Sequence, residues 1–176
     1  MLVGILSDSH GDAAATASAV RLLEQRGAKH LIHCGDICGE AVLDELAGHP
    51  CTFVWGNCDS PGPTMRKYVQ TLGLRWPEPP MILELADERI AVFHGHERHF
   101  ASAADRTDLD YVFYGHTHKY ADRRVGRIRF INPGALHRAR IKTVALLNLK
   151  NDALTFFRLD TGSLLNDPIA SAHYEL

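Results

Sequence analysis

The first half of the chain alternates between short apolar runs and segments with helical spacing. The apolar runs are residues 2–7, 30–34 and 51–55. Asp12 is a plausible N-cap for the first intervening helix, which Gly27 should end, and a second helix is expected between Val42 and Gly48. Apolar runs of this length suit strands that are buried on both faces. The order strand, helix, strand, helix, strand therefore predicts parallel pairing through crossover helices.

The second half has a different pattern, with short strands and turns. A hairpin is predicted around residues 86–88, after a proline-rich joint at residues 77–80, and a short helical stretch is expected around residues 97–106. Further strands are expected at residues 111–114, 121–125, 128–131, 143–149 and 153–159. We therefore predict an α/β (α+β) fold that ends in antiparallel β structure, with two packed sheets and helices outside. The length suits a single domain, 1–176.

Residue types that bind metals follow directly after the predicted strands. Five such clusters occur: Asp8-Ser9-His10, Gly35-Asp36, Gly56-Asn57-Cys58-Asp59, His94-Gly95-His96 and Gly115-His116-Thr117-His118. Ligands bind at the carboxyl edge of the strands in open α/β sheets, so these clusters are expected to share one site. The glycines allow the backbone to turn sharply there. Each motif is weak alone, but five in this order are hard to ascribe to packing, because buried histidines and aspartates without a metal are costly.

The candidate ligands form an oxygen-and-imidazole set. They are Asp8, His10, Asp36, Asn57, His94, His116 and His118. Two carboxylates, one amide and four imidazoles are too many for one tetrahedral zinc ion. They suit two neighbouring divalent ions with one bridging carboxylate. The other histidines (His30, His33, His49, His99, His137 and His173) are expected to be structural or surface residues.

Cysteine content and charge limit the function classes. The four cysteines are Cys34, Cys38, Cys51 and Cys58, without a Cys-x-x-Cys pair. This pattern argues against a disulfide framework or a four-thiolate zinc site and favours a cytoplasmic protein with reduced thiols. The first apolar run is too short for a signal peptide or a membrane span. A net charge of −2 gives no general attraction to nucleic acid or to anionic membranes, but it is compatible with a small phosphate-bearing substrate.

The ordered motifs resemble those of the calcineurin-like metallophosphoesterase superfamily. They are Asp8-x-His10, Gly35-Asp36, Gly56-Asn57, His94 and Gly115-His116-x-His118. The short chain and its Gly-Asn-Cys-Asp sequence are most similar to the small bacterial and archaeal phosphodiesterase branch. The resemblance implies a four-layer αββα sandwich of two mixed sheets flanked by helices. It also implies that Asp8, His10 and His118 bind one metal ion.

The other half of the implied site consists of Asn57, His94 and His116 on a second ion, with Asp36 bridging the two. Such an enzyme hydrolyses a small phosphoester, with a phosphodiester favoured, by in-line attack of a hydroxide held between two divalent metals. Manganese is the first choice, and iron, zinc, nickel and cobalt accept the same ligands.

One position departs from the family pattern. Many members have histidine after the Gly-Asn pair, thought to protonate the departing oxygen, and here that residue is Cys58. Because a thiol is a weak donor, we expect poor leaving groups to suffer most, although Cys58 could equally be a small apolar filler. His96 or Asp59 could replace it as the proton donor, or could orient metal ligands. Asn57 is expected to serve the substrate as well as the metal.

The basic segment at residues 119–142 has two interpretations. Its arginines alternate with apolar residues, as on the solvated face of a strand. The family resemblance instead favours a substrate role for the turn at residues 132–134 and for Arg140. The sequence Ala135-Leu136-His137 stands where relatives often have serine, so substrate contacts in that loop stay open.

Three other functions compete with a hydrolase. A subunit of retromer has this fold and serves as a protein-binding scaffold, but a scaffold needs no full set of metal ligands; Cys58 is the feature that favours it. A superfamily nuclease needs substrate-gripping segments for which this chain has no room. A hydrolase with a single zinc ion would leave several ligands idle. A homo-oligomer is compatible with an exposed sheet edge or the proline-rich joint.

Overall fold

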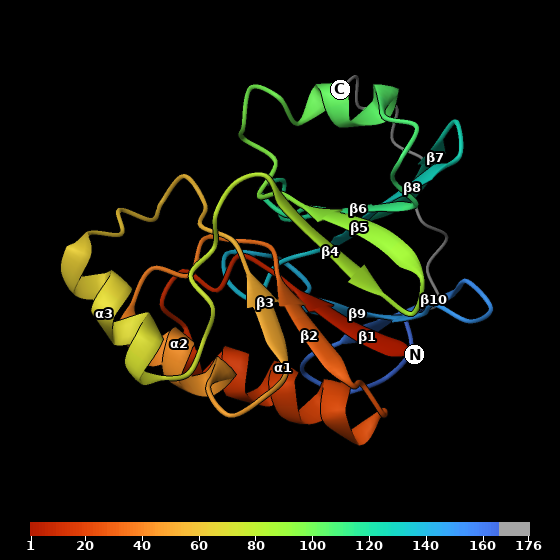
Figure 1. Cartoon of the computed structure of the whole chain (residues 1–176). Coiled ribbons are helices and arrows are strands. Elements are labelled where there is room, and N and C mark those ends of the chain that lie inside the picture. Colours follow the sequence, from red (N-terminus) through yellow and green to blue (C-terminus); the bar gives the residue numbers. More distant parts are fainter. Residues whose placement is uncertain (166–176) are drawn as a thin grey trace.

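Two five-stranded sheets form the centre of the protein in a computed structural model, which describes residues 1–165 (Figure 1). The last residues of the predicted domain, 166–176, and with them His173, lie outside the described part. The first sheet has the order β10-β9-β1-β2-β3. Its strands are β1 (Leu2–Leu6), β2 (His30–His33), β3 (Cys51–Phe53), β9 (Thr143–Asn148) and β10 (Ala153–Arg158). The pairs β1–β2 and β2–β3 are parallel, as predicted, whereas β9 joins β1 in the antiparallel direction.

The second sheet has the order β4-β5-β6-β8-β7. Its strands are β4 (Met81–Leu85), β5 (Glu88–Val92), β6 (Tyr111–Phe113), β7 (Tyr120–Val125) and β8 (Ile128–Pro133). The predicted hairpin is confirmed: β4 pairs with β5 through a turn at Ala86 and Asp87, both with positive φ. The pairs β7–β8 and β9–β10 are antiparallel, as predicted for the end of the chain. The strands β5, β6 and β8 run parallel, which the strand pattern did not predict, so the second sheet is mixed, as the family resemblance implied. The chain between β5 and β6 crosses over the sheet instead of forming a hairpin.

Three helices cover the outer face of the first sheet. They are α1 (Ala13–Gln25), α2 (Glu40–Leu46) and α3 (Pro63–Thr71). The carboxylate of Asp12 accepts from the Ala15 amide at 2.9 Å, which confirms Asp12 as the N-cap of α1. The sequence did not predict α3, which begins with Pro63 at its first position, where no backbone N–H is needed.

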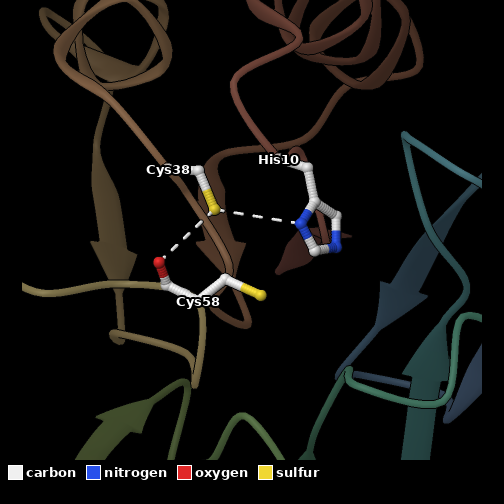
Figure 2. Close-up of side chains that lie close together, drawn as sticks. All are labelled: His10, Cys38 and Cys58. Atoms are coloured by element: carbon white, nitrogen blue, oxygen red, sulfur yellow. Dashed lines mark hydrogen bonds between the residues drawn. The ribbon is translucent and has the colours of Figure 1, made fainter.

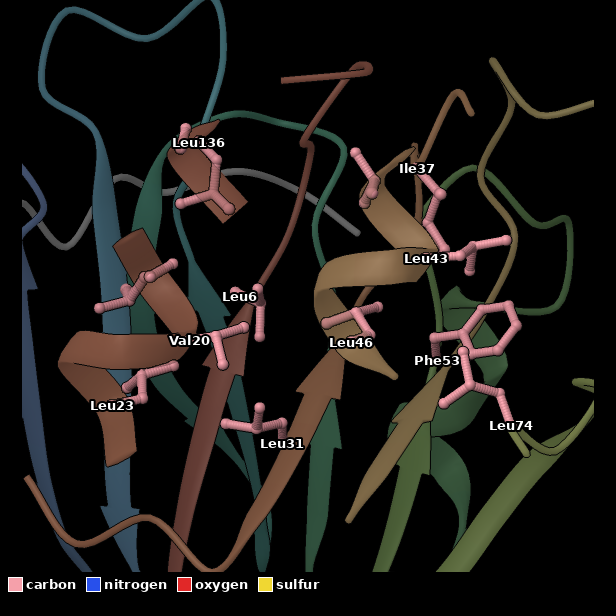
Figure 3. Packing of buried hydrophobic residues seen from close by; sticks show 14 of the residues in the cluster. Leu6, Val20, Leu23, Leu31, Ile37, Leu43, Leu46, Phe53, Leu74 and Leu136 are labelled. Atoms are coloured by element: carbon pink, nitrogen blue, oxygen red, sulfur yellow. The ribbon is translucent and has the colours of Figure 1, made fainter. Parts of the chain in front are cut away.

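The helices pack on the sheet through large aliphatic side chains. Figure 3 shows Leu6, Leu31 and Phe53 of the sheet facing Leu23 of α1 and Leu46 of α2. All five are almost completely buried. Burying a side chain of this size contributes about 1.5–3 kcal/mol, so this contact fixes the helices over the strands whose ends carry the polar clusters.

A second apolar layer lies between the two sheets. Val3, Ile5 and Ile32 of the first sheet share it with Ile90 and Phe113 of the second. A third cluster covers the outer face of the second sheet under the short 3-10 helix η1 (Ala101–Asp105). The expected four-layer sandwich is confirmed, although its last layer is a single 3-10 helix. Within residues 1–165, no helix has both the length and the apolar character needed to cross a membrane.

Candidate metal centre

The loops after β1, β2 and β3 meet the loops after β5 and β6 at one edge of the sandwich. The Asp8 amide donates to Gly35 O at 3.0 Å, which joins the loops after β1 and β2. The His116 amide lies 3.2 Å from both carboxylate oxygens of Asp8, which joins the two sheets. The seven predicted ligands therefore face one region, as the strand-end argument predicted.

Four of these residues form a compact group. One ligand atom each from Asp8, His10, Asp36 and His118 lies within 4.8 Å of the others. His118 Nε2 is 3.2 Å from His10 Nε2 and 3.2 Å from Asp8 Oδ1. Both carboxylates are buried. We call these four residues the compact half.

The remaining ligands, Asn57, His94 and His116, form the open half. His94 Nε2 lies 3.0 Å from Asn57 Oδ1, and the rings of His94 and His116 are 5.1 Å apart at their centroids. His94 is buried, whereas Asn57 and His116 are exposed. Asp36 Oδ2 is 3.4 Å from His94 Nε2 and also 3.4 Å from His10 Nε2. One carboxylate oxygen therefore faces both halves.

The surroundings of His94 favour a positive charge. Its Nδ1 donates to Cys34 O at 2.8 Å, so in the neutral ring Nε2 carries a lone pair. That lone pair faces the oxygens of Asn57 and Asp36, so a proton or a metal ion on Nε2 would be stabilised there. Burial disfavours the charged ring, yet the contacts with Asp36 and Cys34 raise the pKa of His94. A divalent metal ion would satisfy the same lone pairs.

The pKa values of three other donors are shifted towards the forms that bind metals. Burial acts to raise the pKa of Asp36, but hydrogen bonds from His94 and from the Cys58 amide outweigh it and lower the pKa. Desolvation lowers the pKa of His10 and of His116, which keeps both imidazoles neutral. Neutral imidazole and ionised carboxylate are the forms that ligate metals.

The backbone is unusual at most of the predicted ligands. The φ angle is positive at Asp8 (56°), His10 (44°), Asp36 (54°), His116 (67°) and His118 (58°). Residues other than glycine seldom adopt this region, and such strain clusters at functional sites. The outliers support a functional role for the strand ends.

Two glycines allow the loops to approach closely. A Cβ at Gly56 would lie 2.2 Å from Asp36 Oδ1 and 2.4 Å from the Asp36 amide nitrogen. A Cβ at Gly115 would lie 2.6 Å from Asp8 Oδ2. The sequence predicted sharp turns at these glycines; only Gly35 and Gly95 of the four have positive φ, whereas Gly56 and Gly115 provide space.

Asp59 holds two of the loops together. Its carboxylate accepts from the Gly56 amide at 2.7 Å, the Cys38 amide at 2.7 Å and the Ile37 amide at 3.2 Å. A carboxylate with three backbone donors orients the loop, so this geometry favours the orienting role of Asp59 over proton donation.

Sequence reasoning missed Glu97, and it gave the turn that contains Asn132 a substrate role instead of a supporting one. Glu97 accepts from the His94 amide at 2.8 Å and from the Gly95 amide at 2.7 Å. Asn132 donates to Gly115 O at 2.7 Å, which holds the loop after β6. Both residues lie close in sequence to a glycine, which was the available signal for a supporting role. The groups with which they form hydrogen bonds cannot be inferred from sequence spacing.

His33 was expected to be structural or on the surface, and it is structural. It is fully buried; its Nδ1 accepts from the Gly35 amide at 3.2 Å, so its Nε2 donates to Ser9 Oγ at 2.8 Å. Burial lowers the pKa of His33 to about 3. This neutral ring fixes Ser9, which stands between two predicted ligands.

Of the other predicted catalytic and substrate residues, Cys58 and His96 lie beside the centre. The Cys58 amide donates to Asp36 Oδ1 at 2.8 Å, and the exposed thiol accepts from Asn57 Nδ2 at 3.6 Å. The His96 ring centroid lies 5.3 Å from that of His94. Arg140 is exposed.

A different arginine, Arg138, acts on the site. Desolvation lowers the pKa of His10 and raises that of Cys58, and the charge of Arg138 is a smaller influence on both. Sequence reasoning favoured Arg140 through the family resemblance and had no basis for choosing Arg138, because the conformation of the loop decides which arginine lies near the centre.

An apolar cavity of about 230 Å³ lies beside these residues. Its lining includes Trp55, Gly56, Pro77, Pro79, His96 and His99. Gly56 and His96 also border the candidate centre, so the cavity and the centre share a wall.

Comparison with known proteins agrees with the motifs and the fold. Residues 1–152 match the family model for the calcineurin-like phosphoesterase superfamily domain. The chain belongs to this superfamily. The family resemblance seen in the sequence is thereby confirmed.

Two curated members of the superfamily are similar over most of their length. Phosphodiesterase MJ0936 of Methanocaldococcus jannaschii is 27% identical over 138 residues, 76% of this chain and 83% of that protein. Phosphodiesterase YfcE of Escherichia coli is 28% identical over 178 residues, 90% of this chain and 92% of that protein.

Solved structures show the same architecture. An archaeal phosphodiesterase is 23% identical with a TM-score of 0.81, covering 94% of this chain and 100% of that one. Vps29 of Entamoeba histolytica is 23% identical with a TM-score of 0.65, covering 94% of this chain and 96% of that one. At this identity, both likenesses establish the fold alone.

Proposed function

We propose that this protein is a metal-dependent phosphodiesterase with two divalent ions at its candidate centre. The observation that carries the proposal is the position of Asp36, whose Oδ2 is 3.4 Å from a ring nitrogen in each half. A carboxylate placed between two sets of donors suits a bridging ligand. The compact half would then hold one ion through Asp8, His10 and His118, and the open half the other through Asn57, His94 and His116.

The chemistry of the bound ions would be Lewis-acid activation of the phosphoryl group together with supply of a hydroxide nucleophile near neutral pH, for in-line displacement. The protein residues provide the fixed frame. The Cys58 amide holds Asp36, and the Cys34 carbonyl holds the His94 ring with its Nε2 turned inward. Asn57 offers an oxygen without adding negative charge.

The substrate side would be formed by the exposed residues of the open half. His96 lies beside both the centre and the cavity, and Arg138 or Arg140 would offset the charge of the phosphate. The apolar cavity has room for one ester group of a diester. The names of both curated relatives support a diester over a monoester.

Cys58 would shape the choice of leaving group. A thiol is a weak donor, and help from a general acid is typically worth about 10²–10⁴-fold. We therefore expect activated phosphodiesters to react better than alkyl phosphomonoesters.

The test uses metal-stripped protein reloaded with Mn²⁺. A bis-aryl phosphodiester and the matching aryl phosphomonoester are assayed side by side, with Asp36→Asn as the blank. Metal-dependent turnover of the diester that disappears in the blank is expected. Absence of turnover with Mn²⁺, Zn²⁺, Ni²⁺ and Co²⁺ alike would overturn the proposal.

The alternative is a catalytically weak scaffold of the same fold. The similarity to Vps29, one structure of which is a complex with Zn²⁺, is the observation that favours it. A scaffold could bind metal and fail to turn over either ester, so metal binding measured beside activity separates the two functions. The manganese preference, the cytoplasmic location and a homo-oligomer remain predictions.

A further inference from the structure

Two exposed cysteines lie beside the candidate centre. Cys38 follows β2 and Cys58 follows β3, and both thiols face His10 across a small space (Figure 2). Cys38 Sγ is 3.8 Å from His10 Nδ1. One donor atom from each of the three residues lies within 4.8 Å of the other two. These donors come from three different loops.

The backbone holds the two cysteines in place. The Cys38 amide donates to Asp59 Oδ1 at 2.7 Å, and the Cys58 amide donates to Asp36 Oδ1 at 2.8 Å. The φ angle of Cys38 is 58°, a conformation that only surrounding contacts can maintain. The cysteine loops are therefore built to a fixed separation, and their closeness does not depend on flexible side chains alone.

We propose that His10, Cys38 and Cys58 bind a thiophilic divalent cation, zinc or cadmium, at a second site that adjoins the phosphoesterase centre and shares His10 with it. Thiolate and imidazole are the ligands that such ions prefer. With zinc bonds of about 2.3 Å to sulfur and about 2.0 Å to nitrogen, tetrahedral ligands stand roughly 3.5–3.8 Å apart. The 3.8 Å contact lies at the upper end of this spacing, and all three donor atoms lie within 4.8 Å of one another, so binding would draw the donors slightly closer together. Three protein ligands leave a fourth position for water.

Binding releases both thiol protons to solvent, so each sulfur ligates as a thiolate. Desolvation, and after it the charges of Asp59 and Asp36, raises the pKa of Cys38 to about 12. Free thiolate is therefore scarce, which disfavours a role for Cys38 as a nucleophile. A thiophilic cation replaces the protons and removes the repulsion from the carboxylates.

The two sites compete for one imidazole. His10 Nε2 faces Asp36 and His118, whereas Nδ1 faces Cys38. A neutral ring has a single lone pair, so ligation through Nδ1 places the proton on Nε2 and removes His10 from the compact half. This consequence rests on the proposed function, whereas binding at the cysteines does not.

Cadmium titration of the full chain tests the site, in the presence of a non-thiol reductant. Thiolate-to-cadmium charge transfer gives an ultraviolet absorption that carboxylate and imidazole ligands do not produce. The wild type is expected to show this band. Cys38→Ser should weaken cadmium binding by at least about tenfold, because loss of a direct ligand lowers metal affinity more than loss of an outer-shell partner does. Cys51→Ser, whose thiol lies outside the cluster, is the matched control and should keep the band.

A band that is equally strong in Cys38→Ser and in a second variant, Cys58→Ser, would overturn the proposal, as would no band in the wild type. Circular dichroism checks that both variants fold, which their exposed positions favour. Bound Mn²⁺ is followed by electron paramagnetic resonance during the titration, and cadmium should displace part of it in the wild type and less in Cys38→Ser. Diester turnover without the band would overturn this inference alone; the band without turnover would overturn the phosphodiesterase alone.

Discussion

The two halves of the candidate centre differ in their access to solvent. In the compact half, the carboxylates of Asp8 and Asp36 are 0% and 2% exposed. In the open half, Asn57 and His116 are exposed and only His94 is buried. Two buried carboxylates that face each other require positive charge, and burial raises the pKa of Asp8. If both halves hold an ion as proposed, we expect the compact half to bind its ion more tightly and the open half to leave space for substrate.

The largest effect should come from the residue that both halves share. Asp36→Asn is expected to abolish metal binding in both halves. Loss of an outer-shell partner typically lowers activity about 10–100-fold, and we expect a larger loss here because Asp36 would be a direct ligand. His116→Gln should release only the ion of the open half. Metal content after dialysis, measured by atomic emission, checks both variants. Equal metal loss from the two variants would contradict the difference between the halves.

The second effect concerns the leaving group at the open half. Cys58→His supplies a proton donor beside Asn57, so turnover of an alkyl ester should rise by up to about 10². The leaving group of an activated aryl diester needs little protonation, so turnover of that ester should change by much less. Rates for a series of leaving groups measure the dependence. Cys58→Ser is the control, since it removes the thiol without adding an imidazole, and an unchanged dependence in Cys58→His would support the filler role.

Sequence reasoning succeeded where a strand is buried and ends in a polar cluster. Apolar runs located β1, β2 and β3, and the residues directly after them proved to converge. This works because the carboxyl ends of parallel strands share one edge, so that position in the chain determines position in space. The family motifs added the division of the ligands into two sets, which spacing alone could not supply.

The same reasoning failed where structure depends on distant partners. Helix α3 has a single buried residue, Val69, so its apolar pattern is weak. The parallel pairing of β6 with β5 and β8 involves a strand of three residues, too short to reveal its direction. Glu97 holds the loop after β5 through the amides of His94 and Gly95, and Asn132 holds the loop after β6 through Gly115 O; neither role was predicted. Hydrogen-bond partners of this kind follow from the fold and leave no periodic signal.

The third effect tests how closely the halves are joined. Gly56→Ala places a methyl group 2.4 Å from the Asp36 amide nitrogen, and backbone cannot move aside as a side chain can. We expect a loss of about 1–3 kcal/mol in the free energy of unfolding, measured by urea denaturation of the metal-free protein. Gly62→Ser is the control, because nothing lies within 4 Å of a Cβ there and serine suits the N-cap of α3. Equal stability of the two variants would show that the junction is looser than its geometry implies.

The smallest expected effect is a pH dependence of the free energy of unfolding, caused by the buried His33 next to the compact half. The pKa of His33 is lowered to about 3 by burial, against about 6.5 in the unfolded chain. Below pH 6.5 the unfolded state therefore binds a proton that the folded state does not. The contribution of His33 to stability is complete above pH 6.5 and declines as the pH falls towards 3.

His33→Gln removes this titration while keeping an acceptor for Gly35 and a donor for Ser9. Between pH 7 and pH 5, the metal-free wild type should lose about 2 kcal/mol more unfolding free energy than the variant. Urea denaturation at both pH values measures the difference. Parallel losses in the two proteins would mean that His33 is protonated in the folded state. The frame of the compact half would then be charged, and its preference for a cation would have to come from the carboxylates alone.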